Sequence, residues 1–315
     1  MILGVIKIIS PIFILIAVGY LSRQFNLINN STSKEINKFI FYISLPALLI
    51  CKISQVEVNI NEQWYAYFAI ILATLSVSIV AMLSCDYLRI IKSKKWVCVH
   101  GSIRSNMAFI GLPVIFYASN EKTMNIAALL MGLTIPIYNI LGVVFLSLGK
   151  NSVERLSFKK FMHQVITSIA KNPLIIGCII GIALYFIKLN KTHFIIKNLD
   201  LLGNISLSLP LICLGVQMNA SISWQRIKQV FLPTFLKLIL CPLLGLAFLY
   251  LFYSQPSSEL ILIVLILLGC PSAVASYVMA VEMNADHEFA ADTVLATTLF
   301  SFFSMTAILV FIQFF

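Results

Sequence analysis

Long apolar runs are the feature that most limits what this chain can fold into. A transmembrane helix needs about 20 predominantly apolar residues, and ten stretches fit that description. They lie near 3–22, 36–54, 64–84, 97–118, 124–148, 165–187, 198–218, 229–253, 259–281 and 291–313. Only 11% of the 315 residues are charged, whereas a soluble domain carries roughly 25%. The connections are short, so we predict an all-α polytopic membrane protein with ten transmembrane helices in one integral membrane domain.

The distribution of basic residues predicts how these helices are oriented. When the connections are assigned alternately to two sides, one side carries fourteen lysines and arginines and the other carries five. Cytoplasmic connections are enriched in lysine and arginine, so we expect a multi-pass protein of the cell membrane with both termini on the non-cytoplasmic side. The formal net charge of +10 is then explained by topology and contact with anionic lipid, and no nucleic-acid partner is expected.

Two Gly-x-Pro motifs lie in the middle of the fourth and ninth runs. They are Gly111-Leu112-Pro113 and Gly269-Cys270-Pro271. Gly is common just past the end of a helix, and Pro is favoured at the first position of a new one. Both runs are therefore predicted to be broken helices. Broken backbone at membrane depth is tolerated only where it is buried in protein or lines a cavity, and a pair of such breaks is the sequence pointer to a transporter binding site.

Three motifs recur in the same order at nearly the same spacing in the two halves of the chain. They are Ser10-Pro11, Ser44-Leu45-Pro46 and Gly111-Leu112-Pro113, followed by Asn172-Pro173, Ser208-Leu209-Pro210 and Gly269-Cys270-Pro271. We therefore predict two five-helix repeats, residues 1–160 and 161–315. Because five is odd, the second repeat enters the membrane from the opposite side, which makes the repeat inverted and crosses the two broken helices near the midplane.

The predicted crossing has the chemistry of an anion site. A helix that starts at Pro113 or Pro271 presents unpaired amides and a partial positive charge, which favours a carboxylate. Ser272 and Ser276, one turn apart on the same helix, offer two hydroxyl donors. Hydrogen bonding to the backbone and helix packing are the alternatives for both serines.

Polar residues within the runs extend the candidate site. We expect Arg104 to face a substrate pathway or an ion-pair partner, or else to extend its charged end to the membrane–water interface. Asn106 lies deeper and needs a buried partner, and the same argument applies to Asn139 in the fifth run. Together with Gly111, Pro113, Gly269, Pro271, Ser272 and Ser276, the two asparagines form the predicted substrate-binding set.

A second group of residues is a candidate for gating or ion coupling. It comprises Arg104, Ser44, Ser208, Lys237, Glu282 and Asp286. The alternative for the two acidic residues is a solvated loop and helix-terminal acids favoured by the helix dipole. The four histidines are scattered in loops or at the ends of runs, so neither a metal site nor a cofactor is expected.

Several of these motifs resemble the auxin efflux carrier family across essentially the whole chain. They are Arg-x-Asn-x-x-Phe-x-Gly-Leu-Pro from Arg104, Pro-x-x-Asn ending at Asn139, and Gly-x-Pro-Ser-Ala from Gly269. The resemblance implies ten spans in an inverted repeat, crossed fourth and ninth helices, and substrate near Asn106, Pro113, Asn139 and Pro271. Bacterial members, which lie in the inner membrane, are associated with acids such as malate and malonate. Plant auxin exporters continue Asn-Pro as Asn-Pro-Asn-Thr-Tyr, whereas here Leu174 follows Pro173.

These observations predict a secondary active transporter that moves a small organic anion by alternating access. A sodium-coupled carrier of larger organic anions is the alternative within the same architecture. An intramembrane enzyme is disfavoured because no nucleophile–base pair or metal cluster lies at depth. The expected partners are a small carboxylate, a proton or sodium as coupling ion, and membrane lipid, and a homodimer is left open.

Overall fold

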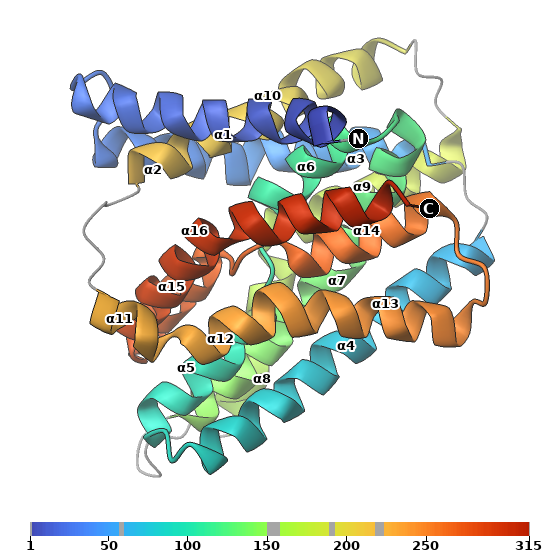
Figure 1. The fold of residues 1–315 in the computed structure, drawn as a ribbon. Coiled ribbons are helices and arrows are strands. Elements are labelled where there is room, and N and C mark those ends of the chain that lie inside the picture. Colours follow the sequence, from blue (N-terminus) through green and yellow to red (C-terminus); the bar gives the residue numbers. More distant parts are fainter. Residues whose placement is uncertain (1, 57–59, 150–157, 189–192, 218–223, 315) are drawn as a thin grey trace. The chain divides into compact units, whose positions relative to one another are not determined.

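The computed structural model describes residues 2–56, 60–149, 158–188, 193–217 and 224–314, and all of its regular elements are helices (Figure 1). Packing divides the chain into two compact units. The first comprises residues 1–63, 108–135 and 171–220, and the second comprises 64–107, 136–170 and 221–315. Each unit therefore draws segments from both halves of the sequence. This division concerns packing alone, so the repeats 1–160 and 161–315 stay a prediction.

The first unit contains two long helices and several shorter ones. They are α1 (Ile2–Gln24), α2 (Asn30–Phe39), η1 (Ile40–Ser44), α3 (Leu45–Ser54), α6 (Leu112–Ala118), α9 (Pro173–Ile187) and α10 (Phe194–Gln217). Helix α1 packs along α10, while α3 packs against both α9 and α10. Glycines permit the close approach: a Cβ added at Gly19 would come within 2.0 Å of the Ile212 carbonyl oxygen, and one at Gly203 within 2.7 Å of Leu48 Cα.

The second unit holds most of the remaining helices. They are α5 (Lys92–Ile103), α8 (Phe158–Ala170), α11 (Trp224–Gln229), α12 (Phe231–Phe235), η4 (Leu236–Leu240), α13 (Cys241–Phe252), α14 (Ser258–Gly269), α15 (Val274–Glu282) and α16 (His287–Ile312). Three further elements, α4 (Ile60–Tyr87), η2 (Met107–Gly111) and α7 (Glu121–Leu148), run across the boundaries between the units.

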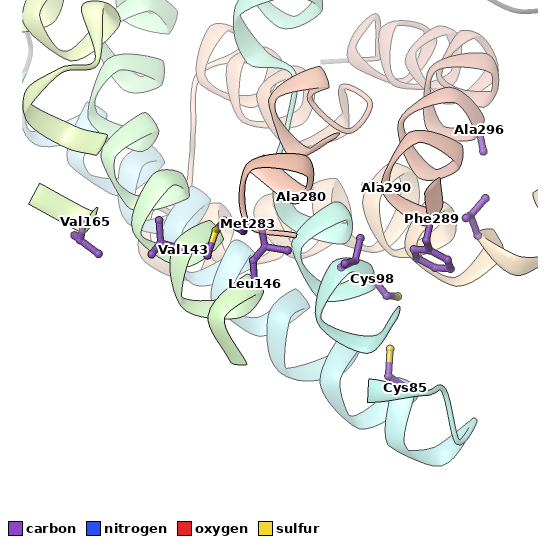
Figure 2. Packing of buried hydrophobic residues seen from close by; sticks show 12 residues of the cluster. Cys85, Cys98, Val143, Leu146, Val165, Ala280, Met283, Phe289, Ala290 and Ala296 are labelled. Carbon is purple, nitrogen blue, oxygen red and sulfur yellow. The ribbon is translucent and has the colours of Figure 1, made fainter. Parts of the chain in front are cut away.

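A buried apolar cluster joins several helices of the second unit (Figure 2). Cys85 of α4, Cys98 of α5, Leu146 of α7 and Phe289 of α16 belong to it, together with Met283, which follows α15. Burying these side chains contributes roughly 25 cal/mol per Å² of apolar surface in water, whereas within a bilayer the contribution comes from close packing. The cluster anchors α5, α7 and α15, whose residues form the candidate site described below.

Three prolines follow directly after short π-helical segments. Pro46 comes after η1, Pro113 after η2 and Pro242 after η4. A proline has no amide donor and clashes with the carbonyl four residues earlier. The wider π turn accommodates that clash without ending the helix. Gly111 accordingly has helical torsion angles (φ −58°, ψ −56°).

The fourth run is therefore interrupted at a different place from the one predicted. The chain leaves the helix at Arg104-Ser105-Asn106, ahead of η2, and is helical at Gly111. The ninth run is interrupted where the sequence indicated, after Gly269, although the next helix begins at Val274 and not at Pro271.

Among the described residues, six helices are long and apolar enough to cross a membrane. They lie at Asn30–Ser54, Glu62–Tyr87, Glu121–Leu148, Phe194–Gln217, Phe231–Phe252 and His287–Ile312. Shorter apolar helices occupy Met107–Ala118, Pro173–Ile187 and Ser258–Gly269. An all-helical polytopic architecture is confirmed, while ten crossings and the inverted repeat remain predictions.

A candidate anion site between two interrupted helices

Two interrupted segments of the second unit pair with each other through their backbones. Ser105 and Ser272 form an isolated antiparallel β-bridge. The Asn106 amide donates to the Pro271 carbonyl at 2.8 Å, and the Ala273 amide donates to the Arg104 carbonyl at 2.8 Å. Hydrocarbon offers no partner for these backbone groups, and leaving each unpaired costs several kcal/mol. The two interrupted segments therefore satisfy each other's backbone hydrogen-bonding groups.

Ser272 is held on both sides of this bridge. Its amide donates to Thr297 Oγ1 on α16 at 3.1 Å, and its hydroxyl donates to the Gly101 carbonyl on α5 at 2.6 Å. The hydroxyl that the sequence offered as a substrate donor is thus engaged with the last turn of α5. Ser276, one turn further along, is buried and its Oγ has no hydrogen-bond partner among the described residues.

Arg104 is buried at the interruption and is bound to α7. Its Nη2 donates to Asn139 Oδ1 at 2.8 Å, and its Nη1 donates to the Tyr138 carbonyl at 3.2 Å and approaches Met279 Sδ at 3.1 Å. Only 9% of the residue is exposed, so the side chain does not snorkel to the interface. Its partners are uncharged, and no ion pair involves it within the described part of the chain.

The two predicted asparagines, Asn106 and Asn139, differ in their hydrogen bonding. Asn139 orients the Arg104 guanidinium. Asn106 is 5% exposed, and its backbone amide donates to the Pro271 carbonyl. A buried side-chain amide needs hydrogen-bond partners, so Asn106 keeps its place as a candidate ligand group.

His100 is a residue of this site that the sequence argument missed. It lies one turn before Arg104 on α5 and is 1% exposed, and not at a solvated end of the helix. Its Nε2 has no hydrogen-bond partner among the described residues. The spacing of four between His100 and Arg104, which places both on one helix face, was the signal that could have revealed it.

Lys237 neutralises the end of one interrupted helix. The side chain is completely buried on η4, and its ammonium donates to the Leu268 carbonyl in the last turn of α14. The last carbonyls of a helix lack intrahelical donors, and a cation there interacts favourably with the helix dipole. The structure thus assigns Lys237 a partner that the sequence could not supply.

The acidic residues between α15 and α16 lie apart from Arg104. Asp286 caps α16 by accepting from the Phe289 amide at 3.0 Å, and Glu282 is exposed. Nearby, Glu288 and Asp292 pair with Arg226 at 3.3 and 2.9 Å. No hydrogen bond or ion pair joins Glu282 or Asp286 to Arg104 among the described residues, and Asp286 is the helix-terminal acid that the alternative interpretation expected.

The other predicted site residues lie in the first unit. Gly111, Pro113 and Ser44 are buried and Ser208 is partly exposed. Ser44 Oγ has no hydrogen-bond partner among the described residues. This unit also contains a partly buried ion pair that was not predicted, in which Lys52 Nζ lies 2.9 Å from an oxygen of Asp200.

One cavity of the second unit is largely apolar and is not lined by Arg104. It has a volume of about 960 Å³ and is lined by residues of α11 to α14 and α16, including Phe231, Leu243, Leu265 and Phe303. None of the polar residues described above lines it. Its lining is mostly apolar, and Lys228, Thr234 and Ser304 are its polar side chains. The anion site is therefore assigned to the interruptions, where more polar groups lie together.

Comparison with known proteins gives two findings. A family model described as "Membrane transport protein" matches residues 4–309. An uncharacterized transporter of Methanocaldococcus jannaschii is 26% identical over 305 residues, which cover 92% of this chain and 93% of that protein.

Proposed function

Because the chain belongs to the membrane transport protein family, as its resemblance to the auxin efflux carriers predicted, we propose that it is a secondary active transporter of a small organic anion. The apolar helices and the family make it an integral, multi-pass membrane protein, and they point to a transporter and not to an enzyme. The proposed substrate is a carboxylate or dicarboxylate such as malate or malonate, moved by alternating access.

The buried guanidinium of Arg104 is the observation that carries this proposal. Translocon-based scales put the cost of an arginine at the centre of a transmembrane helix at about 2.5–3.5 kcal/mol. Arg104 meets only neutral acceptors, among them Asn139 Oδ1 and the Tyr138 carbonyl. A carboxylate accepts parallel hydrogen bonds from a guanidinium, so an anionic substrate supplies the missing negative charge.

Buried polar groups near the interruptions support the same ligand class. Asn106 provides an amide, and Ser276 provides a hydroxyl in the first turn of α15. The Ser276 amide itself donates to the Ala273 carbonyl at 2.8 Å, and the N-terminus of α15 adds a partial positive charge. A substrate with one carboxylate on Arg104 and further oxygens facing these donors matches the chemistry of the site.

Packing in the first unit supports the proposed inverted repeat. An internal two-fold axis that exchanges the halves converts a contact of α1 with α10 into a contact of α9 with α3, and both contacts are present. Gly19 and Gly181, which each lie eight residues after a proline, make close approaches to Ile212 and to Ile50 and Ile53. Ten spans, a bacterial inner-membrane location and non-cytoplasmic termini belong to this proposal.

Binding and uptake measurements on Arg104→Gln test the proposed function. Purified protein is titrated with malonate, malate and aromatic acids, with and without sodium, and uptake is followed in proteoliposomes. Arg104→Gln is expected to weaken carboxylate binding by about 10- to 100-fold, since a hydrogen bond to a charged group contributes about 1.5–3 kcal/mol. Arg226→Gln, which alters an exposed ion-paired arginine of the same unit, is the matched control.

Each outcome of this experiment bears on the proposal. Equal binding by Arg104→Gln and the unchanged protein would contradict a site at Arg104. Absence of binding for every acid tested would remove the carboxylate class. Uptake that requires sodium and prefers larger anions would favour the sodium-coupled alternative.

A further inference from the structure

A second basic side chain shares the surroundings of Arg104. His100 lies in the last turn of α5, Arg104 follows directly after that helix, and both side chains approach Gly142 of α7. A Cβ added at Gly142 would come 2.9 Å from His100 Nε2 and 3.3 Å from Arg104 Nη1. The imidazole and the guanidinium therefore reach the same small area of α7, and they approach it this closely because residue 142 has no side chain.

The Nε2 atom of His100 is unusual because it is buried without a partner. It makes no hydrogen bond to the described residues, although the residue is only 1% exposed. A buried polar atom left unpaired costs about 1–3 kcal/mol. A proton on this atom, with an anion oxygen to receive its hydrogen bond, removes that cost.

The charged and titratable groups on the elements around His100 are otherwise engaged or distant. The hydroxyl of Tyr138 on α7 lies 3.5 Å from Ser105 Oγ, and Lys237 of η4 donates to the Leu268 carbonyl. Asp292 of α16 pairs with Arg226, and Glu282 of α15 is exposed. Helix α12 carries no titratable group. On α5 itself, Lys92, Lys94 and Lys95 lie in the first turn, and the thiol of Cys98 belongs to the apolar cluster. Arg104 is therefore the charge that acts on His100 at short range.

The charge balance of this pair depends on whether an anion is bound. Two cations held close together at low dielectric repel strongly, so with Arg104 permanently protonated the empty site carries one positive charge. A bound dicarboxylate brings two negative charges and reverses the sign of the local field. The imidazole is then favoured as a cation, because opposite charges stabilise each other's ionised forms.

We propose that His100 takes up one proton from water when a dicarboxylate binds to Arg104, so that the protein carries the anion and the proton together. This inference rests on the proposed function and adds the coupling ion to it. The proton binds at Nε2, which then donates a hydrogen bond to the anion. Release of the anion on the other side restores the repulsion from Arg104 and returns the proton to water.

Calorimetric titration with malonate at neutral pH tests this inference. Heats measured in two buffers of different ionisation enthalpy give the number of protons taken up. About one proton per malonate is expected for the unchanged protein, with an affinity that falls up to about tenfold per pH unit. His100→Gln is expected to bind malonate without proton uptake and without this pH dependence. His163→Gln, which alters an exposed histidine of the same unit, should behave like the unchanged protein.

The outcomes separate this inference from the proposed function. Malonate binding without proton uptake in the unchanged protein, or equal uptake in His100→Gln, overturns the role of His100 and leaves the anion carrier standing. Absence of binding for every carboxylate overturns both. If His100→Gln does not fold, His100→Asn takes its place, and binding without proton uptake in the unchanged protein overturns the role of His100 without any variant.

Discussion

Replacing Gly142 with alanine perturbs the candidate site with a single methyl group. The new Cβ would lie 2.8 Å from Met279 Cε, 2.9 Å from His100 Nε2 and 3.3 Å from Arg104 Nη1. All three atoms are the far ends of flexible side chains, so these side chains can move while the backbone of α7 stays in place. Arg104 is then displaced from Asn139 Oδ1, which it now contacts at 2.8 Å.

The expected free-energy changes predict that Gly142→Ala stays folded but binds the substrate more weakly. Alanine is favoured over glycine within a helix by about 0.5–1 kcal/mol, which offsets part of the cost of moving the Met279 methyl group. The unfolding free energy should therefore change by no more than about 1 kcal/mol. Weakening one charge-assisted hydrogen bond to the substrate costs about 1.5–3 kcal/mol, which corresponds to a dissociation constant about 10- to 100-fold higher.

Calorimetry with malonate and a thermal-unfolding scan without ligand together measure both effects. Gly149→Ala is the matched control, since it adds the same methyl group just after α7, and no atom lies closer than 3.3 Å to it. An unchanged dissociation constant in a folded Gly142→Ala protein would refute the assignment of this surface to the ligand. Loss of binding in the Gly149→Ala control would show that the effect is not local.

Two further predictions concern the helix end and the topology. Lys237→Met leaves the Leu268 carbonyl without its donor, so the unfolding free energy should fall by about 1–3 kcal/mol; an unchanged thermal midpoint would contradict this role of Lys237. Because all seven native cysteines are buried, an impermeant thiol reagent applied to whole cells should label Lys122→Cys, on the predicted outer side, and spare Ser93→Cys on the predicted cytoplasmic side. The opposite labelling pattern would reverse the proposed orientation.

Local chemistry made part of this site predictable. Arg104, Asn106 and Asn139 stand out because polar groups inside apolar runs need partners. Gly269-Cys270-Pro271 marks a break because the proline lacks an amide donor, and the structure confirms an interruption after Gly269. The transporter family follows from the same residues, since their spacing is a property of the chain itself.

Other features depend on contacts between segments that are far apart in the sequence. Gly111-Leu112-Pro113 has the same local chemistry as the later motif, yet a π turn accommodates Pro113 and the helix continues. The interruption occurs instead at Arg104–Asn106, where the backbone pairs with residues 271 and 273.

The sequence by itself determined that this protein lies in a membrane, that its helices carry proline-linked irregularities and that Arg104, within an apolar run, needs either a partner or a route to the interface. These conclusions depend on the partition of side chains between water and lipid and on the donors that each residue offers. Only the tertiary structure decided which backbone groups pair across the interruptions, that Lys237 meets Leu268 and that His100 joins Arg104 at Gly142. Such contacts depend on how distant segments pack, which no local pattern specifies.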